Sequence, residues 1–120
     1  MHDEEVGHAV LVEIGAGTGN LTRVLRERAA RLFAIERDRD LLPALRSEFE
    51  GTNVTLLEED AKTAPIRSYF EAGEDPAKDR KNAPRVLAGN LPYQITGMLL
   101  ERAVHEASAL DRCVFMVQKE

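Results

Sequence analysis

The sequence is poor in cysteine and in long apolar runs. Of its 120 residues one is a cysteine, Cys113, which excludes an intramolecular disulfide and fits a reducing compartment. No apolar stretch approaches the roughly 20 residues that span a bilayer. The acidic start, Met1–Glu5, lacks the basic and apolar regions of a signal peptide. We therefore expect a cytoplasmic protein that does not associate with a membrane.

The sequence also lacks an excess of positive charge, since its formal net charge is −5. A module that holds nucleic acid by itself normally shows a basic balance or a basic patch. The charge therefore counts against such a module, but it leaves open an enzyme whose grip on nucleic acid lies in another segment. The histidines are scattered, at His2, His8 and His105, and form no metal-ligand spacing, so we expect no bound metal.

What the sequence does contain is an alternation of short apolar runs and amphipathic stretches. Five runs predict strands, at Ala9–Ile14, Leu32–Ile35, Val54–Leu57, Val86–Ala88 and Cys113–Val117. Apolar residues at helical spacing predict helices between them, over 21–29, 41–49 and 99–107. Cys113 lies in the last apolar run, where we expect it to pack as a small hydrophobe.

This alternation favours a single α/β domain over residues 1–120, with a doubly wound parallel sheet covered on both faces. Right-handed crossovers give the expected strand order 3-2-1-4-5, which places a ligand at the carboxyl ends of the first and fourth strands. The mixed-charge segment Glu71–Pro84 is expected to be an exposed loop. RNA contact through Lys78, Arg80 and Lys81 is the less favoured interpretation of that segment. The chain stops directly after its fifth strand, so we expect a fragment truncated at both ends.

A glycine-rich loop follows the first strand. Gly15, Gly17 and Gly19 allow a tight turn and the close approach of a ligand, and the next helix presents free backbone N–H groups to it. The dinucleotide fingerprint G-x-G-x-x-G needs a glycine at the position of Asn20. The loop G-x-G-x-G after an acidic residue, here Glu13, is instead similar to the cofactor loop of S-adenosylmethionine-dependent methyltransferases.

Two further carboxylates follow strands of the predicted sheet. Glu36 ends the second strand, about 20 residues after the first glycine, where a carboxylate accepts hydrogen bonds from the ribose of nicotinamide and S-adenosylmethionine cofactors alike. Asp38 and Asp40 are interpreted as polar residues that open the next helix. Asp60 follows the third strand and can accept a hydrogen bond from the exocyclic amine of the cofactor's adenine.

The fourth strand is followed by the most informative segment, Asn90-Leu91-Pro92-Tyr93. The amine of a planar base is a poor nucleophile, because its lone pair is delocalised into the ring. Two acceptors, the Asn90 side-chain carbonyl and the Leu91 backbone carbonyl, could hold its N–H groups and turn the lone pair toward a methyl donor. Pro92 would stiffen the turn, and Tyr93 offers a face on which an unstacked base can lie.

In this order the segments closely resemble the ribosomal RNA adenine dimethyltransferases, from Val10 to the end of the chain. The segments similar to that family's three cofactor motifs, its N-L-P-Y motif and its F-M-x-Q-K-E segment are Glu13–Thr22, Ile35–Asp38, Asp60-Ala61, Asn90–Tyr93 and Phe115–Glu120. The resemblance implies a Rossmann-like methyltransferase fold and S-adenosylmethionine as cofactor. It also implies N6-dimethylation of two adjacent adenines in small-subunit ribosomal RNA, by a monomer whose partner is the small ribosomal subunit.

The resemblance also assigns site residues. It implies cofactor contacts from Glu13, Gly15, Ala16, Gly17, Gly19, Glu36, Arg37, Asp60, Ala61 and Asn90, and a target adenine received by Asn90, Leu91, Pro92 and Tyr93. The family usually has proline where Ala16 stands. Its amino-terminal segment that closes over the cofactor, its last strands and its helical carboxyl-terminal domain are absent here. We therefore expect this chain to be part of the S-adenosylmethionine-binding catalytic domain.

Other functions stay open. The ribosomal RNA methyltransferases of macrolide resistance share the expected fold, although the ending Gln118-Lys119-Glu120 favours the small-subunit enzyme. DNA adenine and protein glutamine methyltransferases more often carry proline in place of Leu91. A relative that binds RNA or the ribosome without catalysis is disfavoured by the intact Asn90 and its neighbours. A nicotinamide oxidoreductase is disfavoured by Asn20 and by the lack of a well-placed histidine.

Overall fold

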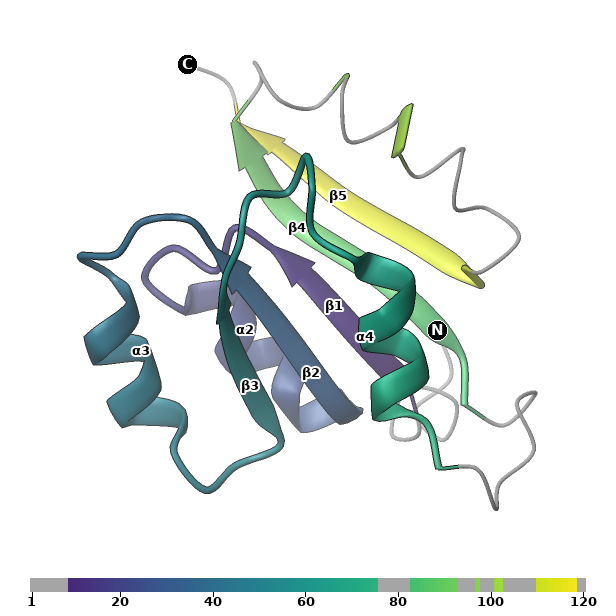
Figure 1. The fold of residues 1–120 in the computed structure, drawn as a ribbon, viewed down its shortest axis with the longest axis horizontal. Coiled ribbons are helices and arrows are strands. Elements are labelled where there is room, and N and C mark those ends of the chain that lie inside the picture. The colour runs from purple at the N-terminus through teal and green to yellow at the C-terminus, as the bar shows by residue number, and fades with distance from the viewer. Residues whose placement is uncertain (1–8, 76–82, 93–96, 98–100, 103–109, 119–120) are drawn as a thin grey trace.

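The computed structural model describes residues 9–75, 83–92, 97, 101–102 and 110–118, and a parallel sheet forms its centre (Figure 1). Its strands are β1 (Ala9–Ile14), β2 (Ala29–Glu36), β3 (Val54–Glu58), β4 (Arg85–Pro92) and β5 (Arg112–Gln118). They are paired in parallel in the order β3-β2-β1-β4-β5. The predicted doubly wound α/β fold and its strand order are therefore confirmed.

Helices cover both faces of this sheet. Helix α2 (Asn20–Leu25), the 3₁₀ turn η1 (Arg26–Arg28) and helix α3 (Leu42–Phe49) lie on one face, and α4 (Ile66–Gly73) lies on the other (Figure 1). The central strand β1 is buried along its whole length. Its apolar residues point alternately to the two faces, because successive side chains of a strand do so. A continuous apolar run therefore suits this strand.

Two apolar clusters hold the layers together. On the α4 face, Val12 and Ile14 of β1 pack with Ile66 and Phe70 of α4. On the opposite face, Leu11 and its neighbours on β2 pack with α3 residues such as Leu45 and Phe49. Burying one such side chain contributes roughly 1.5–3 kcal/mol, so the two clusters fix the sheet relative to its helices.

The boundary between the first helix and the second strand differs from the prediction. Ala29 was expected to continue the helix, but α2 ends at Leu25 and Ala29 begins β2. Ala29 pairs with Ala9 of β1, so sheet pairing takes the residue that helical spacing had assigned to the helix. The 3₁₀ turn η1 reverses the chain between the two elements.

The segment Glu71–Pro84 is only in part the loop that was predicted. Its first three residues, 71–73, are the last turn of α4, which was not predicted at all. This helix is short, but Ile66 and Phe70 are buried against the sheet, and that burial stabilises it. Lys78, Arg80 and Lys81 lie outside the described residues, and so does most of the helix predicted over 99–107, although Gly97, Glu101 and Arg102 are helical.

The last two strands are longer than predicted, and β5 is less buried. Cys113 is exposed and Val114 is 53% exposed, so the expectation of a cysteine packed as a core hydrophobe was wrong. The apolar cluster on the α2–α3 face draws on β1 to β4 and includes no buried residue of β5. Val114, which pairs with Ala88 and points to this face, is exposed.

Candidate cofactor and catalytic site

The glycine-rich loop leaves β1 at the carboxyl edge of the sheet and folds over the end of β2. Gly15, Gly17 and Gly19 have φ values of +74°, +59° and +91°, a backbone region that residues with a side chain rarely adopt. The backbone N–H groups of Gly15 and Ala16 both donate to the carbonyl of Ile35. A Cβ on Gly15 would meet no atom within 4 Å, so the loop leaves open space above this residue.

Glu36, the last residue of β2, anchors this loop. Its side chain is 8% exposed. One carboxylate oxygen accepts the backbone N–H of Gly17 at 2.7 Å, and the other accepts that of Asp38 at 2.8 Å. A carboxylate has about four acceptor sites, so Glu36 retains capacity for two hydroxyl donors. The adjacent Arg37 is exposed.

Glu13 lies beneath the loop and is fully buried. It points to the α2–α3 face, as Leu11 does, and its Oε1 accepts a 2.6 Å hydrogen bond from the hydroxyl of Thr22 on α2. Its Oε2 is buried and has no hydrogen-bond partner among the described residues. Desolvation raises the pKa of Glu13 from 4.5 to about 7; the Thr22 hydrogen bond lowers it, and the charge of Glu36 raises it.

Asp60 begins the tight loop that follows β3. Its Oδ1 accepts the backbone N–H of Lys62 at 2.9 Å, and its Oδ2 accepts no hydrogen bond from the described residues. The preceding residue, Glu59, donates its backbone N–H to the carbonyl of Glu36, so the loops after β2 and β3 are joined. The half-buried Ala61 accepts a hydrogen bond from the guanidinium of Arg102, which also donates to Ala64.

Strand β4 extends beyond the end of β1. The last residue of β1 pairs with Gly89, whereas Asn90, Leu91 and Pro92 continue the ladder with β5 alone. Figure 1 shows the arrowheads of β4 and β5 well beyond that of β1. The prediction that Pro92 lies in a turn was therefore wrong: it is the last residue of the strand, because β5 supplies a partner up to Gln118.

The half-buried Asn90 lies on the same face of the sheet as Glu13 and Glu36. Val86 and Ala88 alternate with Leu87, which belongs to the α4 face, and Asn90 continues the alternation toward the α2–α3 face. Its side-chain amide makes no hydrogen bond with another residue of the described chain. Tyr93 lies outside the described residues.

The predicted cofactor segments after β1, β2 and β3 are thus joined by hydrogen bonds at one edge of the sheet, and Asn90 lies on the neighbouring strand. Sequence reasoning did not single out Arg23 or Arg102, whose guanidinium groups bind backbone carbonyls of the first and third loops. Nothing in the sequence pairs Arg102 with Ala61, 41 residues away. Asn20 lies three residues before Arg23, a spacing at which side chains on a helix can meet. This spacing is a weak signal in the sequence for the position of the Arg23 side chain.

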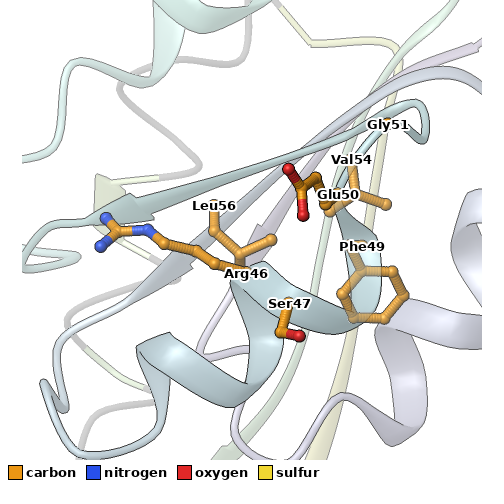
Figure 2. Close-up of a pocket in the computed structure, with 7 residues that line it drawn as sticks. All are labelled: Arg46, Ser47, Phe49, Glu50, Gly51, Val54 and Leu56. Atoms are coloured by element: carbon orange, nitrogen blue, oxygen red, sulfur yellow. The ribbon is translucent and has the colours of Figure 1, made fainter.

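A hollow of about 450 Å³ lies elsewhere, at the opposite end of β3 (Figure 2). Side chains from the end of α3 and the start of β3 line it, including Arg46, Phe49 and Val54. None of the predicted cofactor or catalytic residues is among its lining residues. It is therefore separate from the site at the carboxyl edge.

Comparison with known proteins agrees with this geometry. The family model described as ribosomal RNA adenine dimethylase matches residues 7–120. The chain belongs to this family. Among solved structures, this dimethylase-family chain is similar to the 23S rRNA methyltransferase ErmE, with a TM-score of 0.72 and 27% identity over 97% of this chain and 42% of ErmE. It is also similar to a dimethyladenosine transferase from Plasmodium falciparum, with a TM-score of 0.63 and 28% identity over 92% of this chain and 36% of that one.

Curated relatives of this chain are named ribosomal RNA small subunit methyltransferase A. The protein from Acidobacterium capsulatum is 37% identical over 96% of this chain, and that from Anaeromyxobacter dehalogenans strain 2CP-C is 40% identical over 92%. The chain spans 38% of the length of each of these two relatives.

Among the described residues, no helix is long and apolar enough to cross a membrane, and no cluster of three or more His, Cys, Asp or Glu side chains could hold a metal ion.

Proposed function

We propose that this chain carries the catalytic centre of an S-adenosylmethionine-dependent enzyme that dimethylates adenine N6 in small-subunit ribosomal RNA. Membership of the ribosomal RNA adenine dimethylase family supports the reaction class. The observation that carries the proposal is the position of Asn90. It lies on the strand next to the glycine loop, beyond the end of β1, on the face that holds Glu36.

The residues at the carboxyl edge fit this cofactor. The space over Gly15, where a Cβ would meet nothing, admits a ligand close to the backbone. Glu36 has acceptor sites left for two ribose hydroxyls, and Asp60 has one carboxylate oxygen left for an adenine amine. When bound, S-adenosylmethionine supplies an electrophilic methyl group on a sulfonium sulfur. Arg37, Ala61, Gly17 and Gly19 border the same pocket in this proposal.

The chain contributes orientation to the reaction rather than a strong base. The Asn90 Oδ1 and the Leu91 backbone carbonyl accept the two N–H hydrogens of the target amine, which directs the nitrogen lone pair at the methyl carbon. The amine would lose one proton on methylation, and this proton would pass to water, because neither the Asn90 amide nor the Leu91 carbonyl is a strong base. The fixed φ of Pro92 holds the strand end in place, and Tyr93 provides the stacking face for the base.

A second substrate is favoured by one observation, the similarity to ErmE, which is named a 23S rRNA methyltransferase. In that case the same site would modify adenine in large-subunit RNA. The relatives named for the small subunit, at 37% and 40% identity, favour the small-subunit substrate over this alternative. We accordingly name the small ribosomal subunit as the partner of this site, and a monomer as the active form.

The test is transfer of labelled methyl groups from S-adenosylmethionine to purified small and large ribosomal subunits that lack adenine methylation. We expect label in small-subunit RNA, recovered after digestion as N6,N6-dimethyladenosine, and no label with the Asn90→Ala variant, which loses an acceptor for the amine. Label confined to large-subunit RNA would establish the alternative substrate. Binding of the RNA and the cofactor without any transfer would instead indicate a non-catalytic relative.

A further inference from the structure

Arg23 is an exposed residue of helix α2, and its side chain hydrogen-bonds to the residues on either side of Gly19 in the glycine-rich loop. Its guanidinium donates to the backbone carbonyl of Thr18 at 3.0 Å and to the side-chain oxygen of Asn20 at 3.1 Å. It also forms a bidentate pair with Glu48 of α3, at 2.5 and 2.7 Å. One side chain thus connects the glycine loop, α2 and α3.

These contacts complete the attachment of the loop. On its inner side, the loop is held by the backbone N–H of Gly17, which donates to Glu36. On its outer side, the carbonyl of Thr18 has Arg23 as its partner. The loop contains three glycines with positive φ, and glycine is the residue with the largest backbone freedom. Contacts on both sides are therefore needed to keep it in one shape.

The guanidinium also packs closely on Gly19. A Cβ built on Gly19 would lie 3.3 Å from Nη2 of Arg23 and 3.1 Å from Cδ2 of Leu45. The planar guanidinium therefore lies against the backbone where the loop enters α2. Its fork of donors can serve the carboxylate and the carbonyl at once, whereas a lysine ammonium offers only a point charge.

The pair is exposed, so its effect should appear in the loop rather than in the fold. The side chains of Arg23 and Glu48 are 45% and 40% exposed, and exposed ion pairs add little to global stability. Among the described residues, Arg23 is the side chain that hydrogen-bonds to the loop backbone on this side, so we expect the loop conformation to depend on Arg23 more than the folded core does.

We propose that Arg23 is a positioning residue of the S-adenosylmethionine loop, with Glu48 holding its guanidinium in place. The identity of the ligand in this inference rests on the proposed function, whereas the effect of Arg23 on the loop conformation does not. Arg23 does not contact the cofactor in this account. It holds the Thr18 carbonyl in place. The glycine-rich loop is thereby fixed on this side, while Glu36 fixes it on the other side through Gly17.

The test compares wild type with Arg23→Ala, Arg23→Lys and Glu48→Gln, and uses Arg46→Ala as a control that removes an exposed positive charge from α3. Two measurements are made on each protein: the Kd for S-adenosylmethionine by calorimetry, and the amide NMR shifts of the loop glycines without ligand. Thermal unfolding of each variant is recorded as well.

We expect Arg23→Ala and Arg23→Lys to weaken cofactor binding about five- to tenfold and Glu48→Gln to weaken it less, while Arg46→Ala stays within twofold of wild type. The amide shifts of Gly17 and Gly19 should move in both Arg23 variants, with an unchanged unfolding temperature. Unmoved glycine shifts in both Arg23 variants, or wild-type affinity in both, would overturn the inference. If the wild-type chain does not bind S-adenosylmethionine but the glycine shifts still move, the proposed function fails while the role of Arg23 in the loop stands.

Discussion

At the scale of single residues, the carboxyl edge of the sheet combines two carboxylates with different environments. Glu36 is hydrogen-bonded to two backbone N–H groups, whereas among the described residues Glu13 has one hydroxyl donor and one oxygen without a partner. Burial raises the pKa of Glu13 and favours its neutral form. Both residues lie at or next to the carboxyl end of a strand. They nevertheless present carboxyl groups in different environments to a ligand.

The environment of Glu13 predicts how stability depends on pH. Burial raises its pKa in the folded chain from 4.5 to about 7, so the folded state holds a proton that the unfolded state has lost. The stabilisation from this proton is complete below pH 4.5 and is lost as the pH rises to about 7, by up to about 3 kcal/mol. Glu13→Gln should remove this loss, so that its free energy of unfolding exceeds that of wild type at pH 8.

Urea unfolding between pH 5 and pH 8 measures this effect. The exposed Glu27→Gln serves as the control, because it makes the same substitution outside the core. A wild-type stability that rises over this interval, or a Glu13→Gln variant with the same pH profile as wild type, would show that the carboxyl group is already charged in the folded chain.

Glu36 gives the second prediction at this scale. Glu36→Gln keeps the side-chain length but removes the charge and one of the two acceptor oxygens that bind Gly17 and Asp38. We expect binding of S-adenosylmethionine to weaken by about 1–3 kcal/mol, through lost charge-assisted hydrogen bonds to the ribose. Calorimetry on this variant and on the exposed control Glu50→Gln checks it, and equal affinities for all three proteins would remove Glu36 from the list of ribose ligands.

The sequence predicted the acidic residues at the strand ends, but it did not predict the arginine residues that hydrogen-bond to the loops beside them. Glu36 and Asp60 could be located because they follow apolar runs at the edge where parallel strands end. Arg23 and Arg102 could not, because both bind backbone carbonyls. For Arg102, the acceptor at Ala64 is 38 residues away and is brought near only by the folding of the chain. Because every residue has a backbone carbonyl, the sequence alone does not show which one a side chain binds.

At the scale of elements, strand order was predictable and element ends were not. The order follows from the alternation of strands and helices with right-handed crossovers. The ends depend on the neighbouring strands: β5 draws β4 out to Pro92, and pairing with β1 takes Ala29 from the helix. Helix α4 was missed although Ile66, Tyr69 and Phe70 have helical spacing, because a helix of eight residues carries a short pattern and depends on burial against the sheet for its stability.

The turn at the start of α2 gives a prediction at this scale. Gly19 and Gly51 both have positive φ, at +91° and +75°. A Cβ on Gly19 would also meet Leu45 at 3.1 Å, whereas a Cβ on Gly51 would meet nothing within 4 Å. Gly51→Ala should therefore cost about 1 kcal/mol of stability from the backbone alone, and Gly19→Ala about 2–3 kcal/mol.

Urea unfolding of the two variants at a single pH checks this pair. The comparison isolates crowding from backbone strain, because both positions share the strain and only one is crowded. Equal losses of stability at Gly19 and Gly51 would mean that Leu45 and Arg23 shift aside without cost.

At the scale of the whole molecule, the fold gathers the loops after β1, β2 and β3 and the end of β4 at one edge. The whole sequence carries a formal net charge of −5, which does not favour RNA binding by itself. The chain spans 38% of the length of the two relatives described above. Binding of the proposed cofactor is therefore the part of the proposed activity that this chain can test most directly.

The most direct test of the proposed function is calorimetric titration of this chain with S-adenosylmethionine, with NAD⁺ as the competing cofactor class. We expect saturable binding of S-adenosylmethionine at one site and no binding of NAD⁺, because Asn20 stands where the dinucleotide loop needs glycine. Preferential binding of NAD⁺, or no binding of S-adenosylmethionine by a chain that circular dichroism shows to be folded, would contradict it.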